Sequence, residues 1–392
     1  MVNTLLRPRD GSHASVSFSE LLFDLIYVFA VTQLSHYLLH HLTLTGVFES
    51  LVLWFAVWLA WQYTAWVTNW FDPETRQVRL LLFAIMLTGL FATSAIPDAF
   101  GERGLAFAVA FSVIQIGRTL VVLFFLGRED PLRNNFLRIL GWLSLSAVFW
   151  ISGGIADHQV RLILWSVAVS CEYIAPMSGF YLPVLGRSVS YHEWIIDGHH
   201  LAERCQLFVI VALGETILSA GSMLSEQSTW GGPVIIAVLV AFAGCLAMWW
   251  LYFDTSSKAG SQAIAAAQNP GRMGAWFHYV HVVLVGAIVL YAVASELVIA
   301  SPAAHTTLPA AAILTGGPVV YVSANAVYKR IIYGRFPLSH ITGLAAFIVL
   351  IPILLVTNLL IASVLTTGVL IATGVQETYS RLRYLRREYR NN

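Results

Sequence analysis

The sequence has very little charge. Of its 392 residues only 11% are Asp, Glu, Lys or Arg, while 58% are hydrophobic and the mean hydropathy is +0.73. Because a soluble domain carries roughly a quarter charged residues, this composition excludes an ordinary soluble protein and predicts an all-α, polytopic transmembrane bundle. The formal net charge of +1, with no extended basic domain, gives no reason to expect a nucleic-acid partner. The partners that we expect are the lipid bilayer and a small solute or ion.

Cysteines are few, and several familiar motifs are missing from the sequence. The three cysteines, Cys171, Cys205 and Cys245, lie in apolar runs at spacings that match no metal motif, so we interpret them as small buried side chains. The polar N-terminus has no apolar core and no small-residue cleavage site, so no cleaved signal peptide is expected. The sequence also lacks a Walker loop, a dinucleotide fingerprint, a nucleophile elbow and a haem attachment motif. We therefore expect no cofactor.

Long apolar runs divide the chain into twelve expected helices, since a span needs about 20 mostly apolar residues. The apolar stretch from Ile341 to Val375 is too long for one helix, and we divide it near Thr357-Asn358. The expected helices lie at 18–40, 46–70, 78–97, 104–126, 137–156, 160–182, 202–223, 232–253, 275–299, 308–332, 340–356 and 358–377.

The basic residues support this division and orient the chain. If both termini and the loops after even-numbered helices share one face, that face holds 19 of the 22 Lys and Arg residues. The opposite face holds Arg103 and Arg161, and Arg118 lies inside the fourth expected helix. Since basic residues collect on the cytoplasmic side, the pattern predicts a protein of the cell membrane with both termini in the cytoplasm.

The two halves of the chain resemble each other. Three pairs of segments agree in order: SFSELLFDLIYVFAVTQLSH (17–36) with HLAERCQLFVIVALGETILS (200–219), WFD (70–72) with YFD (252–254), and GREDPL (127–132) with GRFPL (334–338). Six helices per half is an even number, so the halves would form a parallel repeat, as in many transporters. The expected organisation is a cytoplasmic N-terminal segment (1–17), a first six-helix repeat (18–182), a cytoplasmic linker (183–201), a second six-helix repeat (202–377) and a basic cytoplasmic tail (378–392).

Polar side chains within or next to the apolar runs are the candidates for function. A charge at the centre of a bilayer costs at least about 2.5–3.5 kcal/mol, so such groups face protein or water and usually mark a site. The candidates for a substrate or proton path are Glu20, Asp24, Gln33, His36, Arg118, Glu172, His200, Glu203, Arg204 and Glu215.

The helix expected at 18–40 carries polar side chains on two faces. Glu20 and Asp24 lie one turn apart near its inner end, whereas Gln33 and His36 lie towards the outer end. At a rise of 1.5 Å per residue, Glu20 and His36 are about 24 Å apart and belong to different sites. A helix that is polar on two faces has little surface left for lipid, so we expect it to be surrounded by other helices.

Arg118 is the obvious counter-ion for Glu172 or Glu215. The alternative is that these groups are paired buried charges that hold helices in register. If Arg118 pairs with one of the two acids, the other lacks a strong cation. Burial of such a carboxyl favours its neutral form, so that it could bind and release a proton near neutral pH.

A further polar cluster precedes the helix expected at 202–223. Its members are His192, Glu193, Asp197, His199, His200 and Glu203. Histidines and carboxylates at such spacings can chelate a metal. However, the HExxH pattern is absent and Asp197 suits the N-cap region of the following helix, so we interpret the segment as an interfacial polar loop and expect no metal.

Two segments resemble the signature segments of the low temperature requirement A (LtrA) family of multi-pass membrane proteins. FSELLFDLIYVFAVTQLSH is similar to the family pattern of an acidic residue, a Phe-Asp pair and a Leu-Ser-His ending, and HLAERCQLFVIVALGETIL to His-x-x-Glu-Arg followed by Leu-Gly-Glu. Cys205 and Gln206 stand where an aromatic and a small residue would be expected. A remoter similarity to organellar potassium channels lacks the Ser of their Phe-Ser-Asp motif. The residues that the LtrA resemblance highlights are Glu20, Phe23, Asp24, Ser35, His36, His200, Glu203, Arg204, Gly214 and Glu215.

The family name describes growth in the cold and implies no reaction, so function must be inferred from the polar groups. They favour a proton-coupled secondary transporter in which the helices expected at 18–40 and 202–223 line the path. In this hypothesis Glu215, with Glu172 or Asp24, takes up protons, His36 serves the outer mouth, and His200 with Glu203 serves the inner one. The alternatives are an ion channel, an intramembrane enzyme acting on a lipid or isoprenoid, and a structural scaffold.

Overall fold

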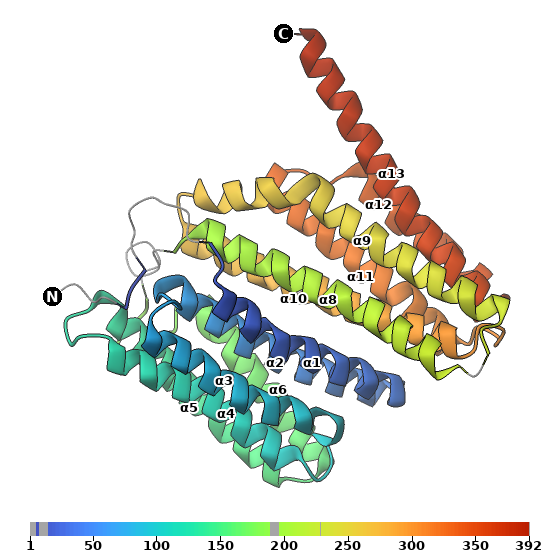
Figure 1. Cartoon of the computed structure of the whole chain (residues 1–392). Coiled ribbons are helices and arrows are strands. Elements are labelled where there is room, and N and C mark those ends of the chain that lie inside the picture. The colour runs from blue at the N-terminus through green and yellow to red at the C-terminus, as the bar shows by residue number, and fades with distance from the viewer. Residues whose placement is uncertain (1–4, 8–14, 189–195, 228, 392) are drawn as a thin grey trace. The chain divides into compact units, whose positions relative to one another are not determined.

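The computed structural model describes residues 5–7, 15–188, 196–227 and 229–391, and in these ranges the chain is helical apart from turns and isolated bridges (Figure 1). The helices of the first half are α1 (Phe18–His40), α2 (Leu44–Trp70), α3 (Arg76–Ala95), the 3-10 helix η1 (Ile96–Asp98), α4 (Gly104–Phe125), α5 (Pro131–Ile155) and α6 (His158–Met177). The helices of the second half are α8 (Gly198–Glu226), α9 (Gly232–Ala265), α10 (Pro270–Ala300), α11 (Leu308–Tyr333), α12 (Leu338–Leu354) and α13 (Leu359–Asn391).

The polytopic helical bundle predicted from composition is confirmed. Eleven helices in the described part of the chain are long and apolar enough to cross a membrane. The eleventh expected helix (340–356) corresponds to α12, whose 17 residues make it shorter than these eleven helices. The division predicted near Thr357-Asn358 is confirmed, because the Asn358 side chain accepts a hydrogen bond from the Ile361 amide and so caps the start of α13.

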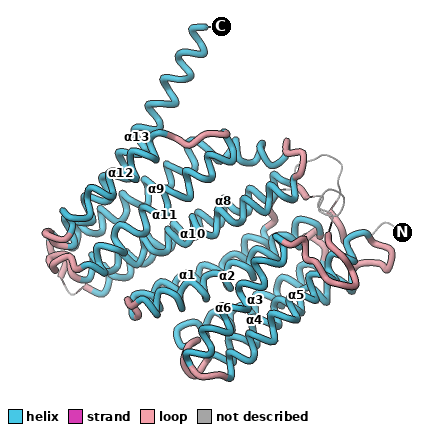
Figure 2. Tube along the Cα trace, turned by 180° about the vertical axis from the view of Figure 1, so that it is seen from behind, coloured by secondary structure: helices cyan, strands magenta, loops and turns pink. Residues whose placement is uncertain are grey.

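The chain forms two compact units. Unit 1 comprises Met1–Arg204 and Ile264–Trp276, and unit 2 comprises Cys205–Ala263 and Phe277–Asn392. In unit 1, α3, α4, α5 and α6 pack in chain order, α1 contacts α2 and α3, and α2 contacts α4 and α6. Figures 1 and 2 show these helices running alongside one another.

The core of unit 1 is aromatic and is built around α2. Trp58 and Trp61 of α2 are fully buried, and Trp150 of α5 packs against Trp165 of α6 with ring centroids 5.3 Å apart. α2 is the most enclosed helix of this unit. The prediction that the 18–40 helix is surrounded on all sides is wrong, because α1 leaves an exposed apolar face that includes Phe18 and Leu25.

The packing of unit 2 relies on small residues and one buried ion pair. Its cluster of buried side chains includes Ala220 of α8, Ala241 of α9 and Ala294 of α10, which let helix backbones approach closely. Lys329 of α11 donates to Glu377 of α13 at 2.6 Å and to the Leu251 carbonyl oxygen at 2.9 Å. This cation therefore holds three helices together.

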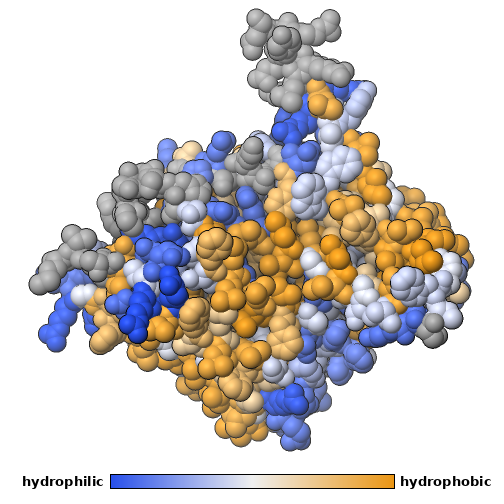
Figure 3. Space-filling model, viewed as in Figure 1, coloured by the Kyte–Doolittle hydropathy of each residue, from blue (hydrophilic) through white to orange (hydrophobic). Residues whose placement is uncertain are grey.

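The surface agrees with a membrane location. In Figure 3 the visible faces of the helices are apolar over most of their length, and hydrophilic residues gather at helix ends. Many of the exposed side chains are large and apolar, among them Phe91, Phe124 and Ile348. On a multi-pass membrane protein, this is the surface that contacts the lipid bilayer.

Arg161 joins helix ends in unit 1. Its buried guanidinium donates to the carbonyl oxygens of Gly153, Ala99 and Gly101 at 3.1, 2.9 and 2.6 Å. These bonds satisfy carbonyl groups near the end of α5 and in the turn after η1. Gly104 leaves space for this side chain, because a Cβ at position 104 would lie 2.4 Å from the Arg161 guanidinium and 2.8 Å from the Ala99 oxygen.

We predict that Gly104→Ala destabilises the protein by about 1–3 kcal/mol, because the methyl group overpacks a fixed site. Gly117 is a matched control on the same helix, since a Cβ there meets nothing within 4 Å. Gly117→Ala should stabilise by about 0.5–1 kcal/mol, the usual gain when Ala replaces Gly within a helix. Unfolding of the purified protein in mixed micelles at rising SDS fraction measures both. Equal stability of the two variants would contradict the packing described here.

Candidate functional site

A capping box at the start of α1 fixes the first candidate, Glu20. The Ser17 hydroxyl accepts from the Glu20 amide at 3.3 Å, and the Ser17 amide donates to Glu20 Oε2 at 2.9 Å. This reciprocal arrangement is what the Ser-x-x-Glu pattern specifies at a helix N-terminus. The Glu20 side chain is thereby held over the first turn, where it has no exposure to solvent.

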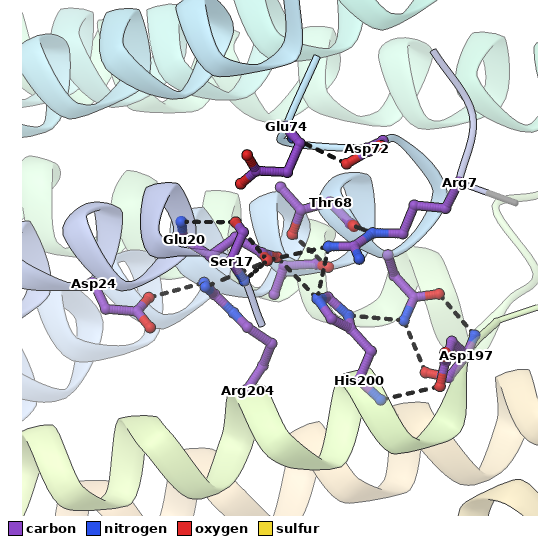
Figure 4. Close-up of polar contacts among 12 residues, drawn as sticks. Arg7, Ser17, Glu20, Asp24, Thr68, Asp72, Glu74, Asp197, His200 and Arg204 are labelled. Carbon is purple, nitrogen blue, oxygen red and sulfur yellow. Dashed lines mark hydrogen bonds and ion pairs between the residues drawn. The ribbon is translucent and has the colours of Figure 1, made fainter. Parts of the chain in front are cut away.

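The N-terminal segment brings Arg7 to this carboxylate. The Arg7 amide donates to the Trp70 oxygen at 2.8 Å, and the Asp72 amide donates to the Leu5 oxygen at 2.9 Å, so residues 5–7 are paired with the end of α2. Arg7 Nε then donates to the Thr68 oxygen at 2.7 Å, and Nη2 donates to Glu20 Oε2 at 3.1 Å. Figure 4 shows Arg7 reaching Glu20 from this segment.

The start of α8 supplies the partners on the other side. The Asp197 side chain accepts from the His200 amide at 3.0 Å, which confirms that Asp197 caps the helix. Asn69 of α2 fixes Asp197 with two bonds, donating to its carbonyl oxygen at 2.8 Å and accepting from its amide at 2.9 Å. His200 and Arg204, one turn apart, point from α8 towards Glu20 and Asp24 (Figure 4).

The hydrogen bonds determine which nitrogen of His200 carries the proton. Because the Asn69 oxygen accepts from Asp197, its NH2 group must be the one that faces His200 Nδ1, 3.1 Å away. His200 Nδ1 is therefore an acceptor, and Nε2 carries the hydrogen and donates to Glu20 Oε1 at 2.9 Å. His200 is thus a neutral donor in this arrangement.

Asp24 and Arg204 form the second half of the network. Arg204 Nη2 donates to Asp24 Oδ1 at 2.8 Å, and Trp61 Nε1 donates to the same oxygen at 2.8 Å. The Arg204 guanidinium also lies 5.8 Å from the Phe23 ring and 5.7 Å from the Trp61 ring, so aromatic faces flank the cation. Arg204 Nη1 is 3.9 Å from Glu20 Oε1, which links the two acids through one arginine.

The charges of this network cancel, but its hydrogen bonding is incomplete. It contains Arg7 and Arg204 as cations and Glu20 and Asp24 as anions, and all are buried except Arg7, whose side chain is 9% exposed. Among the described residues, Asp24 Oδ2 and the Nε and Nη1 of Arg204 have no hydrogen-bond partner. Buried polar atoms normally have partners, so these atoms offer bonding capacity to water or to an entering polar group. We call this set the Glu20 network.

The sequence of this chain is similar to those of known proteins. The profile of the family described as "Bacterial low temperature requirement A protein (LtrA)" matches residues 15–375, nearly the whole chain. The chain belongs to the LtrA family. It is also similar to an uncharacterized protein of Rhizobium meliloti (strain 1021), with 37% identity over 388 residues, 97% of this chain and 93% of the relative. No solved structure matches.

A second buried network lies in unit 1 of this LtrA protein. Glu172 accepts from Gln115 Nε2 and from Ser146 Oγ at 2.6 Å each, and from Trp150 Nε1 at 2.9 Å. The oxygen of the same Gln115 amide accepts from Arg118 Nη2, and Arg118 Nη1 donates to Thr64 Oγ1 at 3.1 Å. Arg118 is therefore coupled to Glu172 through an amide and not by direct contact.

The remaining candidates of this LtrA protein lie elsewhere. Glu215 of α8 lies in unit 2, is 1% exposed, and accepts from Ser219 at 3.0 Å. Gln33 and Glu203 are partly exposed, and His36 is exposed. The structure therefore joins Glu20, Asp24, His200 and Arg204 into one network, and Arg118 with Glu172 into another.

The metal interpretation of the 191–204 segment finds no geometric support in the described ranges. His192 and Glu193 lie outside the described residues. Within the described residues, no group of three or more His, Cys, Asp or Glu side chains could hold a metal ion. His200 and Asp197 act there in hydrogen bonding and helix capping.

Several residues of the two networks were not predicted from the sequence. Asn69 and Gln115 are amides within apolar runs, and the cost of burying an unpaired amide could have identified them as candidates. Arg7 gave no such signal, because it precedes every apolar run and reaches the site only through the pairing of residues 5–7 with the end of α2.

We predict strong coupling between Asp24 and Arg204. Arg204→Met leaves a buried carboxylate without its cation and should destabilise the protein by about 3–5 kcal/mol. Asp24→Asn combined with Arg204→Met removes both charges, so the double variant should be less destabilised than the sum of the two single variants. Unfolding titrations in SDS mixed micelles on all four proteins give the coupling energy. Strict additivity would contradict the pairing.

Proposed function

We propose that this LtrA protein is a proton-coupled secondary transporter, and that the Glu20 network is its inner gate in the closed state. One observation carries the proposal. Two arginines, two acids and a histidine gather at the same end of α1, and all are buried except Arg7, whose side chain is 9% exposed. They come from the N-terminal segment, from α1 and, 180 residues further along the chain, from α8. Such groups are expensive inside a membrane and contribute little net stability, so a functional role best explains them.

The network has the properties of a two-state element. Its parts belong to the N-terminal segment, the first turns of α1 and the first turns of α8, so a shift of any one segment breaks several charge-assisted bonds together. Gates that work by repacking ion pairs behave in this way. The unsatisfied atoms of Asp24 and Arg204 would gain partners when water or solute enters.

The proposed orientation places this gate on the cytoplasmic side. The excess of basic residues on the face that holds both termini supports that assignment. The inner role proposed for His200 is kept in this scheme, with Arg7 and Arg204 added to it, and His36 remains assigned to the outer mouth. Because the acids of the gate are sealed in this arrangement, transport requires the network to open.

Glu215 is the proton-binding residue that we propose. It is buried mid-way along α8 and bonded to Ser219 of the same helix. The oxygens of Glu172 accept from Gln115, Ser146 and Trp150, so a proton on Glu172 would have to replace one of these bonds. We assign Glu172 and Arg118 to the rigid frame of unit 1.

Vesicles that contain the protein and a pH-sensitive dye test the proposal. Wild-type protein should acidify or alkalinise the lumen when one member of a panel of amino acids, sugars, organic acids, polyamines and metal cations is applied. Glu215→Gln cannot bind and release a proton, so we expect proton-linked flux to fall at least about tenfold. The matched control is Glu226→Gln, at the exposed end of the same helix, which should leave flux unchanged.

Other outcomes would replace this function. Ionic currents without coupling to protons would identify a channel. Conversion of a lipid or isoprenoid added to the vesicles, lost in Glu215→Gln, would identify an intramembrane enzyme. Wild-type flux that persists unchanged in Glu215→Gln would refute the role of this residue.

The gate makes a separate prediction about Arg7. Arg7→Gln removes a charge-assisted hydrogen bond to Glu20, which contributes about 1.5–3 kcal/mol. Opening should therefore become at least about tenfold more frequent, since 1.4 kcal/mol is a factor of ten. The Ser17 amide donates to Glu20 Oε2 at 2.9 Å within the network, so the rate at which this amide takes up a deuterium label reports opening. Arg79→Gln, which breaks the exposed ion pair with Glu74, is the control and should not change the labelling rate.

A further inference from the structure

A separate group of titratable side chains lies at the other end of α1. Glu49, in the second turn of α2, is only 3% exposed. Tyr37 of α1 donates its hydroxyl hydrogen to Glu49 Oε2 at 2.6 Å, and His158, the first residue of α6, places Nε2 2.7 Å from Glu49 Oε1. The His158 side chain is 51% exposed. A buried carboxylate is therefore in contact with a histidine that reaches solvent.

Among the titratable side chains described near Glu49, we consider His158 to be the one that can exchange a proton with it. His41 stacks on the Tyr37 ring with ring centroids 4.4 Å apart, and its Nδ1 is bonded to the backbone carbonyl oxygen of Tyr37. Asp98 of η1 lies near the Tyr37 phenol. Asp157 caps α6 by accepting from the Val160 amide. The cation nearest in sequence is Arg161, whose N–H groups are taken up by backbone carbonyls.

An aromatic side chain, Phe100, packs against both partners of the Glu49 carboxylate. The Phe100 ring lies 5.7 Å from the His158 ring and 6.4 Å from the Tyr37 ring. One face of the imidazole is thereby covered while the remainder is open. An imidazole that reaches solvent is well placed to exchange protons with water.

We propose that Glu49, His158 and Tyr37 form the proton-loading site at the outer end of this protein, an assignment that rests on the proposed transport function. A hydronium ion in the outer water breaks one O–H bond to give its proton to His158 Nδ1 and becomes water, and His158 then passes the hydrogen on Nε2 to Glu49 Oε1. One N–H bond forms and one breaks on the ring, one O–H bond forms on Glu49, and the imidazole ends neutral. Tyr37 keeps its own hydrogen and orients the carboxyl group by donating to its second oxygen.

The position of the site within unit 1 fits this role. Tyr37 and Glu20 are 17 residues apart on α1, about 25 Å along the helix. The Glu20 network at the first end is sealed, whereas the Glu49 group at the second end reaches solvent through His158. A transporter whose inner end is closed should take up its proton at the outer end.

Infrared difference spectra recorded during a pH titration in nanodiscs test the site without any transported solute. Wild-type protein should show the carbonyl stretch of a protonated carboxyl that appears on acidification, and this band should be absent from Glu49→Gln. His158→Gln removes the imidazole that competes with Glu49 for the proton, so the band should appear at a proton concentration at least about tenfold lower. His40→Gln is the control, because His40 is the exposed last residue of α1, the helix that carries Tyr37, and this change should leave the band unchanged. An identical band in wild type and Glu49→Gln would overturn the proposal.

The flux assay gives a second readout that separates the two proposals. In vesicles, Glu49→Gln and His158→Gln should shift the external proton concentration for half-maximal flux by about tenfold or more, while His40→Gln should match wild type. Absence of proton-linked flux from wild type would refute the transport function and leave the spectroscopic test of the site standing. Normal flux with an unchanged proton dependence in both variants would refute the loading site alone. His158→Gln, at a half-exposed position, keeps this conclusion open to test if Glu49→Gln fails to fold.

Discussion

The bonding of the Glu20 carboxylate is the constraint around which unit 1 is organised. A carboxylate with no access to water must be surrounded by donors, and Glu20 draws them from its own cap, from Arg7 and from His200. Each of these donors depends on further structure. Arg7 needs the pairing of the N-terminal segment with α2, and His200 needs the bonds of Asn69 to set its tautomer. One buried charge thus determines how three segments of the chain meet.

The network of Glu172 and Arg118 satisfies a buried carboxylate in a different way. Arg118 and Glu172 are both buried, but Gln115 stands between them, accepting from the cation and donating to the anion. An amide can do both because it carries a donor and an acceptor. In unit 2, Lys329 of α11 binds Glu377 of α13 directly. The two pairs occupy the fourth and sixth helices of the repeats that the sequence predicts.

Sequence reasoning predicted the helices well, because hydropathy and turn chemistry are local properties. The break before α13 follows from the capping ability of Asn358, which is readable at a single position. The acids and basic groups of α1 and α8 were also recognisable, since polar residues one turn apart in apolar runs are uncommon. Their pairing was not, because it depends on which helix faces which. The burial of α2 in place of α1 likewise depends on tertiary packing, since both sequences are apolar and polar in similar measure.

The pairing of residues 5–7 with the end of α2 has a practical consequence for work on this protein. Leu5, Leu6 and Arg7 are paired with the end of α2 in unit 1, although they precede the first apolar helix. Affinity handles or fluorescent fusions joined directly at the start of the chain would crowd this short ladder. The far end of α13 is the better point of attachment, since Figure 1 shows that helix extending away from the rest of unit 2.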